Sequence, residues 1–178
     1  MSRTVFNLLT LSMIAVPLGG CGLAQTVKEG STSTAETVFY KQVNTLHLDF
    51  DGRSALNTDA ADMSALSLPT LVRVYQLRDG KALERATYDG LLSGDERLLD
   101  SALLDKRAMV VKPGAGTRLS VPMDKRAQVV ALVALFRSPD TENGSWRLIL
   151  TRDDLDPDRA RVIEMGDSQL TLRPWRRE

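Results

Sequence analysis

The feature that most constrains the fold is residues 129–136, which are apolar at every position and lie between Arg126 and Arg137. A run without a polar face suits a strand that is covered on both sides, although a buried helix gives the same pattern. The β-branched valines in the run favour the strand, because their stiff side chains fit a pleated sheet better than a helix. We therefore expect a central, doubly covered strand here.

Other segments have the length and alternation of half-buried strands. In residues 42–50, Leu46, Leu48 and Phe50 point to one side of an extended chain and polar residues point to the other. Further strands are predicted at residues 70–78, 107–111, 117–121, 146–150 and 168–172. The chain is therefore predicted to be mainly β.

One stretch, residues 87–104, is predicted to be a small helical insertion. Ser93 and Glu96 have the spacing of a capping box, and an apolar stripe at helical spacing follows them. Such a stripe is typical of core packing, so we expect the helix to cover one edge or end of the sheet.

The connection between the first two strands, residues 51–69, is longer than the about two to five residues usual in a hairpin. Long loops in compact domains commonly carry function, and a solvated linker has no use for apolar side chains. The apolar residues of this loop are Leu56, Met63, Leu66 and Leu68. Two interpretations remain open: a binding loop that displays them, and a loop folded over its own core.

The N-terminus has the pattern of a lipoprotein signal. Arg3 precedes an apolar run at residues 5–16, which is too short for a membrane span. The segment ends in Leu18-Gly19-Gly20-Cys21, which resembles the bacterial lipobox, where the cysteine is acylated and the peptide is cut before it. A lone thiol at the end of an ordinary signal peptide is the plainer alternative. We expect a covalent lipid on Cys21.

These features divide the chain into three parts. Residues 1–20 are predicted to be the signal peptide, and residues 21–41 an acylated cysteine with a flexible, polar tether. Residues 42–178 are long enough for one domain with its own core. Gly22 stands where an aspartate would, by resemblance to sorted lipoproteins, favour the inner membrane, so we expect attachment to the periplasmic face of the outer membrane.

The residue types that catalysis needs are scarce. Cys21 is the only cysteine, and the only histidine, His47, lies beside Asp49 on the polar side of the first predicted strand. An enzyme needs a nucleophile with a base, a metal cluster or a phosphate-cradling loop. We therefore expect no enzyme and no cofactor, with paired carboxylates for acid–base work as a minor alternative.

Metal and nucleic acid are also not expected. Asp154, Asp156 and Asp158 have the spacing of a calcium loop, but Arg159 stands where that loop requires glycine. A plain acidic loop, partly neutralised by neighbouring arginines such as Arg161, is the simpler interpretation. The whole chain has 23 basic and 23 acidic side chains, a balance that argues against nucleic acid as a partner.

Several short motifs along the predicted domain carry a family resemblance. They are, in order, Leu56-Asn57-Thr58-Asp59, the segment 68–77, Tyr88-Asp89 with Leu91, Val111-Lys112-Pro113-Gly114 and Trp146-Arg147. In this order, and behind a lipobox, they resemble the TssJ (SciN-like) lipoproteins of the bacterial type VI secretion system. The resemblance covers most of the chain after Cys21.

The resemblance implies a transthyretin-like, two-sheet β-sandwich with a small helical insertion. It implies a structural adaptor at the outer membrane that binds the periplasmic C-terminal domain of the inner-membrane TssM protein, within the type VI membrane complex. In this family the contact is attributed to the loop between strands one and two. The candidate contact residues here are Leu56, Asn57, Thr58, Asp59, Met63, Leu66 and Leu68. Residues 60–65 depart from any motif of the family.

A second function competes with the adaptor: a periplasmic lipoprotein carrier that binds a small or apolar ligand inside the sandwich. Interiors packed at normal density leave little volume for such a ligand in a domain of this size. Co-purified ligand in native mass spectrometry would distinguish the carrier from the adaptor.

Overall fold

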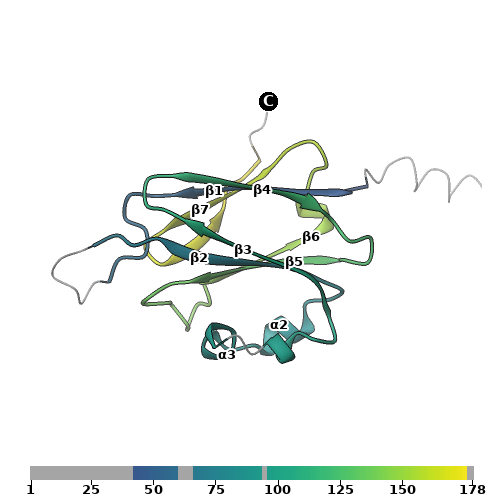
Figure 1. The fold of residues 1–178 in the computed structure, drawn as a ribbon, viewed down its shortest axis with the longest axis horizontal. Helices are drawn as coiled ribbons and strands as arrows, with labels where there is room; N and C mark the ends of the chain where they lie inside the picture. Colours follow the sequence, from purple (N-terminus) through teal and green to yellow (C-terminus); the bar gives the residue numbers. More distant parts are fainter. Residues whose placement is uncertain (1–41, 60–65, 94–95, 176–178) are drawn as a thin grey trace, which may run out of the picture. The chain divides into compact units, whose positions relative to one another are not determined.

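Two four-stranded sheets pack against each other in the part of the chain that the computed structural model describes, residues 42–59, 66–93 and 96–175. One sheet has the order β4-β1-β7-β8 and the other the order β3-β2-β5-β6 (Figure 1). The strands are β1 (Thr45–Gly52), β2 (Thr70–Leu77), β3 (Leu103–Val111), β4 (Gly116–Pro122), β5 (Val129–Leu135), β6 (Arg147–Thr151), β7 (Arg161–Gly166) and β8 (Gln169–Leu172). The prediction of a mainly β, two-sheet sandwich is confirmed.

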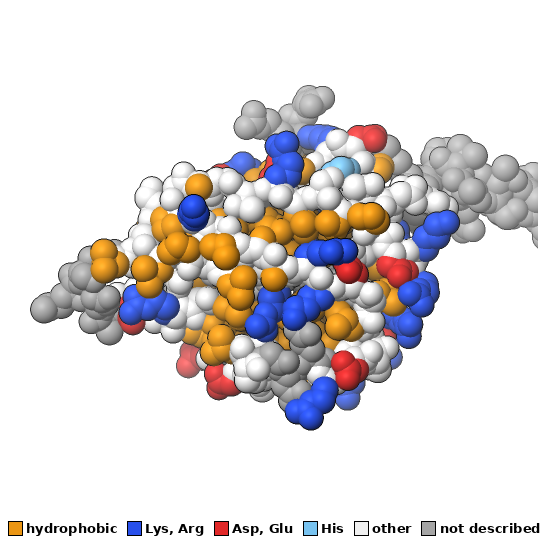
Figure 2. All heavy atoms as spheres, viewed as in Figure 1, with side chains coloured by type: hydrophobic (Ala, Val, Ile, Leu, Met, Phe, Trp, Pro, Cys, Tyr) orange, Lys and Arg blue, Asp and Glu red, His pale blue; other side chains and the backbone are white. Residues whose placement is uncertain are grey.

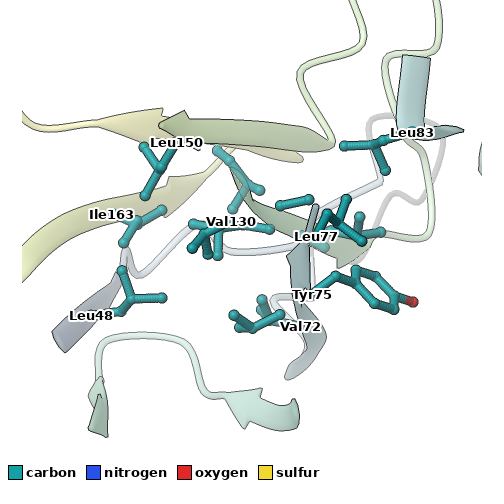
Figure 3. Close-up of a cluster of buried hydrophobic side chains, with 14 of the residues drawn as sticks. Leu48, Val72, Tyr75, Leu77, Leu83, Val130, Leu150 and Ile163 are labelled. Carbon is teal, nitrogen blue, oxygen red and sulfur yellow. The ribbon is translucent and has the colours of Figure 1, made fainter. Parts of the chain in front are cut away.

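The first sheet is built around β1, which pairs antiparallel with β4 and parallel with β7. The predicted alternation holds, because Leu46, Leu48 and Phe50 are buried and the residues between them are partly exposed. Leu48 and Ile163 of this sheet meet Val130 and Leu150 of the other in the space between the sheets (Figure 3). Apolar packing between the two inner faces thus forms the core.

The second sheet contains the apolar run as an inner strand, since β5 lies between β2 and β6. Val130 shares a face with its cross-strand partner Gln76, whose side chain donates to Pro122 O of β4 at 2.9 Å. Val133 lies on the opposite face with its partner Arg73. Both valines are buried, so the predicted central strand, covered on both sides, is confirmed.

Short helices cover the outer face of this second sheet (Figure 1). They are α2 (Lys81–Arg85), α3 (Tyr88–Leu92) and the 3₁₀ turn η1 (Glu96–Leu98); a second 3₁₀ turn, η2 (Arg152–Asp154), follows β6. Polar contacts anchor α3, since the Arg73 guanidinium donates to Leu91 O and the Tyr88 hydroxyl donates to Phe136 O. No helix among the described residues is long and apolar enough to span a membrane.

The helical prediction needs correction in its extent. Residues 87–104 do not form one helix: α3 starts after Thr87, whose side chain accepts from Gly90 N at 3.2 Å, and Ser93 is its C-cap rather than an N-cap. Leu103 already belongs to β3, where it pairs with Leu77 of β2. Sheet pairing therefore overrides the helical spacing of the apolar residues at the end of this stretch.

A strand that the sequence did not predict completes the first sheet. Residues 161–166 follow the acidic loop and were not expected to be extended, yet they form β7 beside β1. The alternation here begins with a buried arginine, Arg161, at an inward position, where an apolar residue is usual. Because an arginine stands at this inward position, the period-two pattern of the strand is not visible in the sequence.

Candidate partner-binding site

The β1–β2 loop is fixed at its base by backbone hydrogen bonds to the turns at the same end of the sandwich. Arg53 N donates to Met165 O at 2.8 Å, and Gly114 N of the β3–β4 turn donates to Arg53 O at 3.3 Å. Asp167 N of the β7–β8 turn donates to Ala55 O at 3.0 Å. The start of the loop is therefore fixed in place by hydrogen bonds to β7 and to both neighbouring turns.

Two residues of the loop are packed into the domain. Leu56 is fully buried, and its carbonyl accepts from Leu68 N at 3.1 Å, which closes the base of the loop. Asn57 is also buried; it has a left-handed backbone with φ of 55°, and its Oδ1 accepts from Arg137 N at 2.7 Å. Short polar side chains tolerate this conformation better than most residues.

The returning side of the loop displays apolar side chains. Leu66 is 58% exposed and Leu68 is 37% exposed, although Leu68 N is tied to the base of the loop. The loop is at the end of the domain that lies at the left of Figure 1, and Figure 2 shows apolar atoms exposed there. Contiguous exposed apolar patches commonly mark protein contact sites, which makes these two leucines candidates for a contact.

The two interpretations of the loop therefore apply to different residues. Leu56 and Asn57 fold over the core, and Leu66 and Leu68 face outwards. Thr58 and Asp59 are half-buried between these groups. Met63 lies outside the described residues, as do Cys21, the predicted signal peptide and the tether.

The β7–β8 turn also belongs to this site, and sequence reasoning missed it. Asp167 and Ser168 both have a positive φ, of 49° and 59°, which is the geometry of a tight two-residue hairpin. The Ser168 hydroxyl donates to Thr58 O at 3.4 Å. A turn signal was not recognisable here, because β7 itself was not predicted.

Gly52 is the point where the loop leaves the sheet. A Cβ atom at this position would lie 2.5 Å from Lys112 O and 2.9 Å from Val111 Cγ1, so only glycine permits this close approach. The β3–β4 turn and the β1–β2 loop are thus packed backbone to backbone. This contact is part of what orients the loop.

The other candidate side chains form ordinary surface contacts. His47 Nδ1 is 2.9 Å from Ser120 Oγ, and Asp49 pairs with Arg118 at 2.8 Å, so His47 and Asp49 do not act as a pair. Asp156 Oδ1 accepts from the backbone of Asp158, at 2.8 Å, in a local turn. The described residues contain no group of three or more acidic, histidine or cysteine residues placed to hold a metal ion.

Comparison with protein families finds one whose model matches most of this chain. The T6SS-SciN family, described as type VI secretion lipoproteins that include VasD, EvfM and TssJ, matches residues 44–172. This range spans nearly the whole described domain. A comparison with curated proteins finds no match.

Solved structures give the same result. A chain of the structure "Type VI membrane complex" is 36% identical with a TM-score of 0.70, and covers 75% of this chain and 100% of its own length. A chain of the structure described as the T6SS protein TssM C-terminal domain from EAEC is 34% identical with a TM-score of 0.67 and the same coverage.

A third structure, the T6SS lipoprotein TssJ1 from Pseudomonas aeruginosa, is 21% identical with a TM-score of 0.58, and covers 76% of this chain and all of its own. At that identity it bears on the fold alone, and it agrees with the transthyretin-like sandwich that was predicted. The matched range of the family model and the two structures above 30% identity establish the family as well as the fold. The chain belongs to the TssJ (SciN) family of type VI secretion lipoproteins.

Proposed function

We propose that this protein is an outer-membrane-anchored structural adaptor that binds the periplasmic C-terminal domain of TssM through its β1–β2 loop. The family is one of structural, non-enzymatic lipoproteins. Chains about one-third identical to this one occur in structures described as the TssM C-terminal domain and the type VI membrane complex. The observation that carries the loop assignment is the exposure of Leu66 and Leu68 on an anchored base.

A rigid base makes physical sense for such a contact. Ordering a free peptide on binding costs conformational entropy, and a loop that is already fixed avoids much of that cost. Burying one exposed leucine fully contributes about 1.5–3 kcal/mol. Leu66 and Leu68 each expose only part of their surface, so burying both in a contact contributes about 2 kcal/mol in total.

The binding test is a calorimetric titration of residues 22–178 with the TssM C-terminal domain. The double variant Leu66→Ser/Leu68→Ser is expected to weaken binding about 30-fold or more, since about 2 kcal/mol of apolar burial is lost. Ile149→Ser is the matched control, because Ile149 is 39% exposed on β6, outside the loop. Equal affinities for the double variant and the wild type would place the contact elsewhere.

The membrane anchor is proposed to be lipid on Cys21. One acyl chain gives only marginal attachment at about 0.8 kcal/mol per buried CH₂, whereas an acylated and cleaved lipoprotein carries several. In cells labelled with palmitate, the wild-type protein is expected to carry label and to fractionate with the outer membrane. Cys21→Ser is expected to lose the label; label that persists in this variant would contradict the assignment.

The carrier function has weaker support. Side chains from both sheets, among them Leu48, Leu150 and Ile163, fill the space where a ligand would have to lie (Figure 3). The adaptor is expected to show no co-purified ligand in native mass spectrometry. A bound ligand of defined mass would favour the carrier.

A further inference from the structure

A buried arginine marks a second site, away from the β1–β2 loop. Arg161, the first residue of β7, is only 4% exposed, and its Nε atom has no hydrogen-bond partner among the residues that the structure describes. Burial lowers the pKa of Arg161, and the nearby charge of Asp154 opposes this shift. A buried donor without a partner is rare, and for a cation it is unfavourable.

The guanidinium of Arg161 lies against an aromatic ring beside a cavity. Its Cζ atom is 4.1 Å from the centre of the Trp175 ring, and Cζ of Arg159 is 5.0 Å from the same centre. Arg159, Arg161 and Trp175 line a cavity of about 360 Å³, together with Arg173 and Pro174. Two cations therefore converge on one ring at the edge of an open space.

The carboxylates near this cavity have other partners. Asp154 Oδ2 accepts from both Thr151 N and Thr151 Oγ1 at 2.8 Å. Arg173, the third arginine of the cavity, pairs with Glu164 and Asp51, both at 2.7 Å. The Trp175 ring lies against both Arg159 and Arg161, and Asp154 adds a favourable charge near Arg161.

We propose that Arg159, Arg161 and Trp175 form a binding site for a phosphate group. A guanidinium presents donors in a planar fork that matches two phosphate oxygens, and charge-assisted bonds of this kind are about twice as strong as neutral ones. An anion in the cavity would supply the partner that Nε of Arg161 lacks. The half-exposed Trp175 ring lies against the Arg161 guanidinium and would hold it in place for the bound group.

Two sources could supply this phosphate: a phospholipid headgroup or free phosphate. The proposed lipid anchor on Cys21, which would hold the domain near phospholipid headgroups, favours the headgroup. This preference rests on the proposed lipid anchor; the site itself does not.

The test measures tryptophan fluorescence of residues 22–178, which contain the complete described core, during titration with inorganic phosphate at constant ionic strength. Trp146 is buried against Tyr88, so the response is expected to come from Trp175 and to disappear in Trp175→Phe. Arg161→Gln is expected to raise the dissociation constant at least about tenfold, through loss of a charge-assisted contact. Arg159→Gln, at an exposed position, is expected to do the same without risk to the core.

Arg126→Gln is the matched control, because Arg126 is an exposed arginine that pairs with Asp124 and lies outside the cavity. Vesicles of phosphatidylglycerol in phosphatidylcholine identify the source. If the vesicles compete with inorganic phosphate for the site, the ligand is the headgroup; if they do not compete, the ligand is free phosphate. A fluorescence signal that does not saturate with phosphate would overturn the proposal. So would equal dissociation constants for wild type, Arg126→Gln and Arg159→Gln. Titration with TssM is independent of every one of these outcomes.

Discussion

Asn57 shows how one side chain stabilises a functional loop from inside the domain. Its φ of 55° turns the chain after Leu56, and its Oδ1 accepts the backbone N–H of Arg137 from the segment between β5 and β6. The two interactions depend on different properties, backbone conformation and side-chain chemistry. Substitutions can therefore separate them.

Asn57→Ala is expected to destabilise the domain by about 2–4 kcal/mol, because it leaves the Arg137 N–H unpaired and places an alanine in the left-handed region. Asn57→Gly keeps the conformation and loses only the hydrogen bond, so its loss is expected to be about 1 kcal/mol smaller. Urea unfolding of both variants beside the wild type measures the difference. An Asn57→Ala domain as stable as wild type would show that the turn does not depend on Asn57.

Asp124 gives a pH-dependent prediction. Hydrogen bonds from the Arg126 side chain, at 2.9 and 3.1 Å, and from Arg126 N lower the pKa of Asp124 from 3.8 to about 2. A lowered pKa means that the ionised form favours the folded state above pH 3.8, and that this contribution is lost as the pH falls through about 2.

An NMR titration of the Asp124 carboxyl carbon is expected to give a midpoint near the lower value in wild type and a higher midpoint in Arg126→Gln. Identical midpoints in the two proteins would contradict the assigned cause.

At the scale of elements, a strand or helix could be predicted only where its pattern of apolar residues was clear in the sequence. Residues 129–136 are apolar throughout, and the predicted inner strand is there. β7 was missed because Arg161 occupies an inward position. The stretch 87–104 was assigned to one helix because Leu98, Leu99 and Leu103 have helical spacing, whereas pairing with β2 takes the last of these into β3.

The junction of β1 with its loop gives a prediction at this scale. Gly52→Ala would put a Cβ atom 2.5 Å from Lys112 O, a backbone atom that cannot move without shifting the β3–β4 turn. A loss of about 1–3 kcal/mol in stability is expected, as for other overpacked positions. Gly80→Ala is the control, since its Cβ would meet nothing within 4 Å, and a change within about 0.5 kcal/mol is expected. Equal melting temperatures for the two variants would refute the close contact.

At the scale of the whole molecule, the domain separates its proposed contacts. The β1–β2 loop is held at one end by the β3–β4 and β7–β8 turns, whereas Arg161, with Trp175 against it, lies opposite Leu48 in the middle of β1. The sandwich, the family and the long connection between β1 and β2 could all be predicted from the sequence. The sequence did not predict which side of the loop is buried, because the preceding residues Arg53 and Ala55 are fixed by bonds to β7 and its turn, and β7 left no pattern in the sequence.

The central claim is that TssM binds the exposed part of the β1–β2 loop. Amide hydrogen exchange of residues 22–178, alone and with the TssM C-terminal domain, tests it without any substitution. If TssM binds there, new protection is expected to be concentrated in residues 58–68, with little change in β5, whose amides are already protected by pairing with β2 and β6. Protection confined to the sheet faces or the helices, with loop amides exchanging as in the free protein, would contradict it.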